Sequence, residues 1–191
     1  MAKLFMCNTS NVFEMKFGRP QTVLNDAERP NGVIVTLGDT QEATARELDH
    51  CHAITDGALE SVEGAFIVVA PEINAQQYRT VDGQIGKFVL EAGETYSAYK
   101  LSKLDRIEYS EAYFKDASGL AVGDKVKVIA KDTNGERFEK DDSAGCLRVV
   151  TATELWLPVM LQANTATAQG SGNTAKLMPA SVKMYKLEVV K

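Results

Sequence analysis

The chain has 191 residues, of which 45% are hydrophobic and 25% charged, and its formal net charge is -5. These proportions are typical of a folded globular protein and exclude a disordered or fibrous chain. The basic residues are scattered, so no Lys or Arg run is present to neutralise successive phosphates, and we expect no nucleic-acid partner.

No apolar stretch approaches the roughly 20 residues that a membrane-spanning helix needs. The sequence starts without the pattern of a secretory signal, so we expect no membrane association and synthesis in a cytoplasm. Three widely spaced cysteines do not predict a disulfide framework.

Residues 1–30 are polar and irregular, and we expect them to form an extended N-terminal arm. Phe5, Phe13 and Phe17 are spaced too loosely for a helical stripe or for strand alternation. Such aromatic side chains can pack on the protein's own core or dock on a neighbouring subunit, and both alternatives stay open. We take the three residues as candidate partner contacts.

From Asn31 onward the chain changes to short β-favouring runs separated by turn residues. The run at 65–70 is apolar at every position, which predicts a strand buried on both faces. Asn134-Gly135 lies between two strand-like runs and is a strong hairpin signal. Strands are expected at 33–37, 65–70, 87–90, 95–101, 106–110, 125–130, 137–140, 146–151 and 185–189.

The C-terminal third contains two further features. The apolar run Leu155–Leu161 is interrupted by Pro158, which predicts a sheet edge or a bend. Residues 162–175 have few bulky side chains and are expected to be a flexible loop. Helix-favouring composition is confined to 41–48, which is too short for a stable helix without packing.

These patterns predict an all-β protein, a small β-sandwich or barrel with an extended N-terminal arm and little helix. We expect three regions: the arm at 1–30, a β-rich body at 31–161, and a loop with a final strand at 162–191 that completes the body.

Two sequence features resemble reactive sites but lack an essential element. The segment Gly170–Leu177 has alanine and leucine where a phosphate-binding loop requires glycine before its lysine and serine or threonine after it. His50, Cys51 and His52 are adjacent, whereas metal ligands are usually spaced pairs, and Cys51 lacks the sequence context of a nucleophile. We therefore expect no metal, no cofactor and no enzymatic activity.

The remaining polar candidates are carboxylates, and one aromatic residue is a candidate contact. We expect five of them in solvated turns, because their spacing does not require an acid-base pair or a calcium site: Asp105, Glu108, Glu139, Asp141 and Asp142. Trp156 is expected in the core, or at an exposed edge where it could contact a partner.

Four segments resemble, in strand order and turn placement, small capsid-associated proteins of tailed bacteriophages: 31–35, 66–72, 90–93 and 99–101. The resemblance covers roughly residues 30–130. It implies a decoration or cement protein that binds the major capsid protein on the virion surface, often as a homo-oligomer. Multivalent attachment needs no catalytic group, and an acidic surface is tolerable when the partner is protein.

Alternative functions remain open. The chain could be a tail or head-tail connector protein, or its strands could form a small barrel that binds a ligand or nucleic acid. An enzyme that uses Cys51 with His50 or His52 would require those groups to meet in a pocket.

Overall fold

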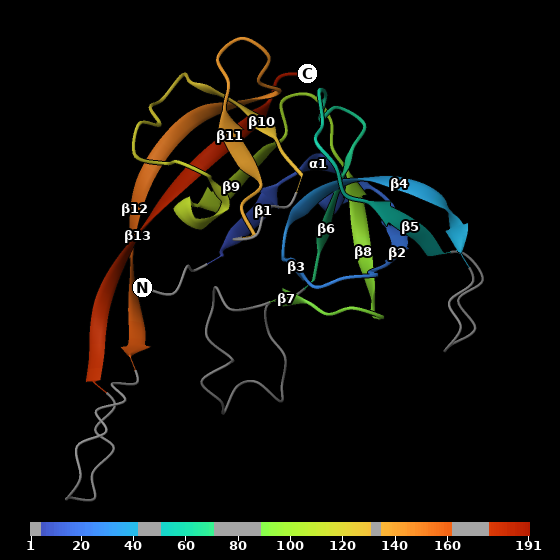
Figure 1. Ribbon diagram of the computed structural model, residues 1–191, viewed down its shortest axis with the longest axis horizontal. Helices are drawn as coiled ribbons and strands as arrows, with labels where there is room; N and C mark the ends of the chain where they lie inside the picture. Colours follow the sequence, from blue (N-terminus) through green and yellow to red (C-terminus); the bar gives the residue numbers. More distant parts are fainter. Residues whose placement is uncertain (1–4, 42–50, 71–88, 131–134, 162–175) are drawn as a thin grey trace, which may run out of the picture.

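The computed structural model of the protein describes residues 5–41, 51–70, 89–130, 135–161 and 176–191 (Figure 1). It is mostly β, and it contains a closed five-stranded barrel and a six-stranded antiparallel sheet. The prediction of an all-β protein with a small barrel and little helix is confirmed.

The elements of the N-terminal half are β1 (Cys7–Asn11), α1 (Phe13–Phe17), β2 (Gln21–Leu24), β3 (Arg29–Pro30), β4 (Val33–Gln41), β5 (Cys51–Thr55) and β6 (Phe66–Val69). Those of the C-terminal half are β7 (Val89–Leu90), β8 (Thr95–Lys100), β9 (Arg106–Ser110), the 3-10 helix η3 (Glu111–Tyr113), β10 (Lys125–Val128), β11 (Phe138–Lys140), β12 (Leu147–Leu161) and β13 (Lys176–Val189).

The barrel closes in the order β2-β5-β4-β6-β8. Four of its five strand pairs are antiparallel, and the β2–β5 pair is parallel. Each of the five strands supplies a residue to one hydrophobic cluster, which therefore fills the barrel interior: Val23, Val33, Val35, Ile54, Val68 and Ala98.

The larger sheet has the order β1-β9-β13-β12-β10-β11. Its buried face packs around aromatic side chains, with the Tyr109 ring 4.8 Å from the rings of both Tyr113 and Phe138, measured between centroids. Phe114 lies 5.1 Å from Tyr185 in an edge-to-face contact. This aromatic cluster is the centre of the second core.

Two strands, β4 and β6, separate the two cores. Val35 and Val68 belong to the barrel interior, whereas their sequence neighbours Ile34 and Ile67 belong to the core under the six-stranded sheet. Because successive strand residues face opposite sides, a strand between two cores must be apolar at consecutive positions. The prediction that the run at 65–70 is buried on both faces is confirmed at Ile67 and Val68.

Over residues 5–30, which the structure describes, the prediction of an extended N-terminal arm at 1–30 is wrong. Strand β1 pairs with β9 at the edge of the six-stranded sheet, and β2 is a wall strand of the barrel. Val12 and Val23 are fully buried in the two cores. Sequence periodicity missed this segment because its strands are short and a helix interrupts them. Strand β1 also pairs with a strand about 100 residues away, and β2 pairs with strands about 30 and about 75 residues away.

Most strands predicted further along are present. The hairpin around Asn134-Gly135 is confirmed by the antiparallel pairing of β10 with β11, in which Val128 lies opposite Phe138. Strand β9 alternates as expected at 106–109, whereas Ser110 is also buried, and its hydroxyl accepts the Met6 N–H at 3.0 Å. Residues 42–48 and 162–175, predicted as a weak helix and a loop, lie outside the described residues.

The C-terminal strand is central to the sheet. As predicted for 185–189, Tyr185, Leu187 and Val189 are buried in the core, and β13 pairs with β9 on one side and β12 on the other. The two longest strands are β12, with 15 residues, and β13, with 14. Figure 1 shows their distal parts running away from the rest of the molecule.

Candidate functional site

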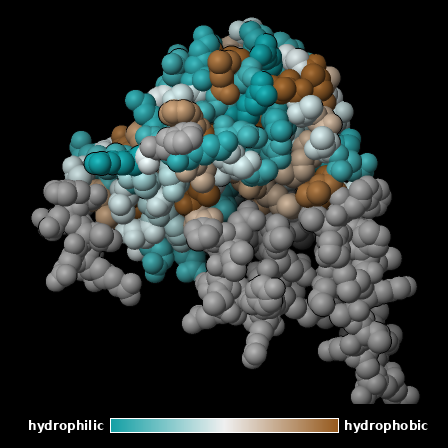
Figure 2. Space-filling view, turned by 180° about the vertical axis from the view of Figure 1, so that it is seen from behind, coloured by the Kyte–Doolittle hydropathy of each residue, from teal (hydrophilic) through white to brown (hydrophobic). Residues whose placement is uncertain are grey.

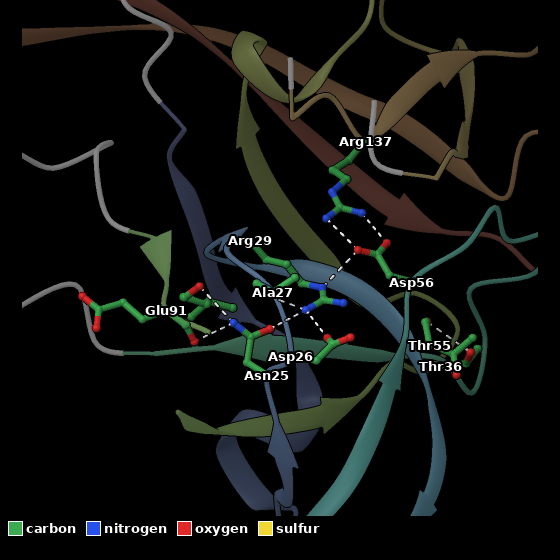
Figure 3. Close-up of polar contacts among 10 residues, drawn as sticks. Asn25, Asp26, Ala27, Arg29, Thr36, Thr55, Asp56, Glu91 and Arg137 are labelled. Atoms are coloured by element: carbon green, nitrogen blue, oxygen red, sulfur yellow. Dashed lines mark hydrogen bonds and ion pairs between the residues drawn. The ribbon is translucent and has the colours of Figure 1, made fainter. Parts of the chain in front are cut away.

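A partly buried polar cluster surrounds Asp56, just after β5 (Figure 3). Its carboxylate accepts a hydrogen bond from Arg29 Nε at 3.0 Å and another from Arg137 Nη2 at 2.9 Å. Arg137 Nη1 donates to the second carboxylate oxygen. Both guanidinium groups are buried, so one carboxylate is shared between two desolvated cations.

Arg29 continues the network into the β3–β7 pair. Its Nη1 donates to Asn25 Oδ1 at 2.6 Å and forms an ion pair with Asp26 at 2.7 Å. The Asn25 amide in turn donates to the backbone carbonyls of Leu90 and Glu91. The cluster thus fixes the short β3–β7 pair against the end of β5.

The charge state of this cluster favours a structural role. Burial alone would raise the pKa of Asp56, but hydrogen bonds and the positive charges of Arg137 and Arg29 outweigh burial, and its pKa lies below the ordinary value. An ionised carboxylate whose oxygens already accept three hydrogen bonds is a poor proton donor or acceptor at neutral pH. We interpret the contact of Asp56 with Arg137 as a structural connection between the barrel and the segment that leads into β11.

A buried carboxylate, Glu188, lies on the six-stranded sheet. Glu188 in β13 is only 3% exposed and lies between Arg106 of β9 and Arg148 of β12, and both guanidinium groups donate to it. These hydrogen bonds lower the pKa of Glu188. The three residues come from adjacent strands, so this contact stabilises the pairing of β9, β13 and β12.

The structure separates the N-terminal aromatic residues that we predicted as partner contacts. Phe5 packs edge-to-face on Tyr113 with 5.1 Å between ring centroids, which favours the own-core alternative for this residue. Phe13 at the start of α1 is 63% exposed. The side chains of Phe17 and Trp156 lie outside the part of the structure that is described, so their contact roles stay predictions.

Asp105, predicted to lie in a solvated turn, is instead buried. One oxygen accepts the Phe13 N–H at 2.9 Å and the other accepts the Ser102 N–H at 2.7 Å. Asp105 therefore joins the start of α1 to the turn at 102–105. That turn carries Leu104, which is 66% exposed and has a φ of 72°, a left-handed conformation unusual for leucine.

The other predicted acidic residues take part in surface pairs or caps. Glu108 pairs with Lys186 at 2.7 Å, and Glu139 pairs with Lys115 at 3.1 Å. Asp141 accepts the N–H groups that follow it in a turn, as expected for a solvated turn.

The histidine-cysteine segment does not form a loop over its described part. Cys51 and His52 belong to β5, where Cys51 is fully buried and His52 Nδ1 lies 3.2 Å from the Gly38 carbonyl. His50 lies outside the described residues, as does most of the segment Gly170–Leu177. Within the described ranges, no group of three His, Cys, Asp or Glu side chains is placed to hold a metal ion.

The distal parts of β12 and β13 form a two-stranded ribbon, which we define as residues 154–161 and 176–183. Within it the register runs from Glu154 opposite Lys183 to Leu161 opposite Lys176. Strand β9 pairs with β13 only from Met184 onward, and no other described strand pairs with the ribbon. Among the described strands, each strand of the ribbon pairs only with the other, as the edge predicted at Pro158 requires.

Sequence reasoning missed the buried arginine cluster and the length of the ribbon. The cluster joins residues up to 81 positions apart, and no local pattern connects them. The ribbon had a visible signal, since the apolar run before 162–175 and the alternating run after it flank one loop as the strands of a long hairpin would.

A comparison with protein-family models, curated proteins and solved structures finds no match to this chain. Every helix in the described part of the chain is too short to cross a lipid bilayer.

Proposed function

We propose that this chain is a structural protein of a tailed-bacteriophage virion that binds the capsid surface as a decoration or cement protein. It acts without catalysis, and its partner is the major capsid protein. The observation that carries the proposal is the two-stranded ribbon of β12 and β13, which extends beyond the six-stranded sheet (Figure 1).

The ribbon is suited to reaching another subunit. Its eight residue pairs span roughly 25 Å at about 3.3 Å per residue. An isolated two-stranded ribbon is marginally stable in water, so a ribbon of this length gains order from a surface on which it can pack. A protein lattice offers that surface at many equivalent positions, and attachment through several copies raises avidity.

The polar groups of the described core also favour binding over catalysis. Asp56, Asp105 and Glu188 each accept at least two hydrogen bonds from neighbouring groups of the protein. Carboxylates held in this way stabilise the fold. A net charge of -5 further favours a protein partner over nucleic acid.

The surface of the described residues carries both hydrophilic and hydrophobic side chains. Figure 2 shows hydrophilic residues over most of this face, with hydrophobic residues in small separate groups. Exposed Phe13 and Leu104 lie on the two segments that Asp105 joins, and exposed Val122 belongs to another turn. Small apolar groups of this kind are normal on a protein surface, so the ribbon is the stronger candidate for attachment.

The test is co-sedimentation of the purified protein with capsids of the same virus. We expect the wild-type protein to pellet with capsids and to saturate at a fixed number of copies per capsid. A variant in which Asn-Gly replaces residues 157–180 keeps the pair Trp156–Ser181 beside a two-residue turn and should fail to pellet. Wild-type protein that stays in the supernatant would refute capsid decoration.

The same assay distinguishes the alternatives. Binding to isolated tails or connectors, without binding to capsids, would assign the chain to the tail or the head-tail connector. Binding only to nucleic acid or to a small ligand would assign it to the barrel-type binding modules.

A further inference from the structure

One row of charged residues crosses four neighbouring strands of the six-stranded sheet. The strands are β10, β12, β13 and β9, which pair in that order (Figure 1). Lys125 of β10 lies opposite Arg148 of β12, and Arg148 lies opposite Glu188 of β13. On its other side Glu188 lies opposite Arg106 of β9. At about 4.8 Å between strands, these four residues form a row roughly 14 Å long, which we call the basic row.

The basic row lies on the face of the sheet opposite the main core. Each of its members has a sequence neighbour in the core under this sheet: Ile107, Val126, Leu147 and Leu187. Because successive residues of a strand face opposite sides, the row faces away from that core. Arg106 and Arg148 are each 49% exposed, and Lys125 is exposed as well. The positive charges are therefore accessible to a partner.

Glu188 fixes the two arginines and leaves part of each guanidinium group free to donate. Nε and Nη2 of Arg106 lie 2.9 and 2.8 Å from one carboxylate oxygen of Glu188. Nη2 of Arg148 donates to the other oxygen. Within the described part of the chain, Nη1 of neither arginine has a hydrogen-bond partner. Two half-exposed guanidinium groups are thus held in place with donors available for a ligand.

Lys125 adds a charge that has no ion-pair partner among the described carboxylates. The lysines near it on the β10–β11 hairpin are both paired. Lys127 pairs with Glu139 at 3.3 Å, and Lys140 pairs with Asp124 at 2.7 Å. Three positive charges and one negative charge give the basic row a net charge of +2, whereas the whole chain has a net charge of -5. The row is therefore a local basic area on an acidic protein.

Acidic side chains beside the basic row limit the size of its ligand. Glu108 occupies the next position of the same face along β9, two residues after Arg106. Asp142 lies at the other end of the row, where its Oδ1 accepts the Lys125 N–H at 3.4 Å, and it is 66% exposed. A long polyanion such as nucleic acid would meet these carboxylates beyond the row, whereas a short acidic segment of a protein fits within it.

We propose that the basic row binds a short acidic segment of a protein partner, whose carboxylates accept hydrogen bonds from Arg106 and Arg148 and approach Lys125. Arginine binds carboxylates through paired N–H donors, and charged contacts of this kind are stronger than neutral ones. Because Glu188 already orders both guanidinium groups, little side-chain entropy is lost on binding. This contact is separate from the ribbon and does not depend on capsid attachment.

Fluorescence anisotropy with a labelled hexaglutamate peptide and the full-length protein provides the test. We expect the wild type to bind the peptide at an ionic strength of about 0.05 M and to release it at about 0.5 M, where the charges are screened. Lys125→Gln and Arg148→Gln should each weaken binding about threefold, as expected for the loss of one exposed charge pair. The double variant should weaken it about tenfold, because the two losses add.

Lys183→Gln is the matched control for the loss of a positive charge. Lys183 is an exposed lysine of β13, an odd number of positions from Glu188 and therefore on the opposite face of the strand, so this variant should bind like the wild type. Circular dichroism and the melting temperature establish that each variant is folded. If Arg148→Gln unfolds, Lys125→Gln still decides the question, because it leaves both ion pairs of Glu188 intact.

Three results would overturn the inference. The first is absence of peptide binding at the lower ionic strength, and the second is binding that Lys125→Gln and Arg148→Gln leave unchanged. The third is a labelled DNA duplex that binds through the same residues more tightly than the peptide, which would replace the protein partner by nucleic acid. None of these results bears on co-sedimentation with capsids, so this inference and the proposed function fail separately.

Discussion

Asp56 accepts hydrogen bonds from both terminal nitrogens of the Arg137 guanidinium, and this paired contact joins two parts of the fold that are 81 residues apart. Asp56 follows the barrel strand β5, and Arg137 directly precedes β11 of the six-stranded sheet. The backbone N–H of Arg137 also donates to the Tyr113 carbonyl at 2.7 Å, which holds the arginine in position.

Asp56→Asn should be strongly destabilising. The substitution leaves two buried guanidinium groups without their shared negative charge, and removing one member of a buried ion pair typically costs about 3–5 kcal/mol. We expect the free energy of unfolding, measured by urea denaturation, to fall by that amount. Asp26→Asn is the matched control, because Asp26 pairs with the same Arg29 but is 69% exposed, and it should cost less than about 1 kcal/mol. Equal effects of the two variants would contradict a stabilising role for the ion pairs of Asp56 with Arg29 and Arg137.

Acid should unfold the protein partly through Asp56 and Glu188. Their pKa values are lowered in the folded state, so the unfolded chain takes up protons first as the pH falls. Their stabilising contribution is fully present above the unfolded-state values, near pH 4 to 4.5, and is lost as the pH falls through the lowered folded-state values. Urea midpoints between pH 6 and pH 2 should show a steeper acid loss for wild type than for Glu188→Gln. Parallel curves would show that Glu188 contributes nothing to the acid dependence.

Gly32→Ala should destabilise the contact between β1 and the loop before β4. Gly32 has a φ of 78°, and an added Cβ would lie 2.3 Å from Cys7 Sγ and 2.8 Å from Cys7 Cβ. Cys7 is fixed opposite Tyr109 in the sheet, so its Cβ cannot move without the strand. We expect a loss of about 3 kcal/mol, the sum of left-handed strain and overpacking.

Gly93→Ala is the control for the steric part of this effect. Gly93 has a similar φ of 83°, but an added Cβ would meet nothing within 4 Å. Its substitution should therefore cost only the left-handed strain, about 1–2 kcal/mol. A loss for Gly32→Ala no larger than that for Gly93→Ala would show that Cys7 can adapt.

Leu104→Asn should stabilise the protein. Leu104 has a φ of 72°, and its side chain is mostly exposed, so it has strain without the compensation of burial. Asparagine tolerates the left-handed conformation better, and we expect a gain of about 0.5–1 kcal/mol in the free energy of unfolding. Lys103→Asn, at the neighbouring exposed position, should give no gain. A destabilised Leu104→Asn variant would mean that the leucine side chain makes a stabilising contact.

Local sequence patterns predicted the strands whose signals lie within a few residues. The alternation at 185–189 marked a strand with one apolar face, and Asn134-Gly135 marked the β10–β11 hairpin. The uninterrupted apolar run at 65–70 also indicated burial on both faces, because a strand that is apolar at every position carries apolar side chains on each face. The missing motifs of a phosphate-binding loop and of a spaced metal site were also readable from the sequence alone.

The tertiary structure decided how these strands combine. Nothing local places β1 and β2 in two different sheets, or brings Arg29 and Arg137 to the same carboxylate, since both depend on pairing between residues far apart in the chain. The same holds for the ribbon: its apolar residues were visible in the sequence, but only the register of β12 against β13 sets Pro158 opposite Pro179 and carries both strands beyond β9. Side-chain periodicity is a local property of a strand, whereas strand order and register are set by which long-range pairing buries the most apolar surface.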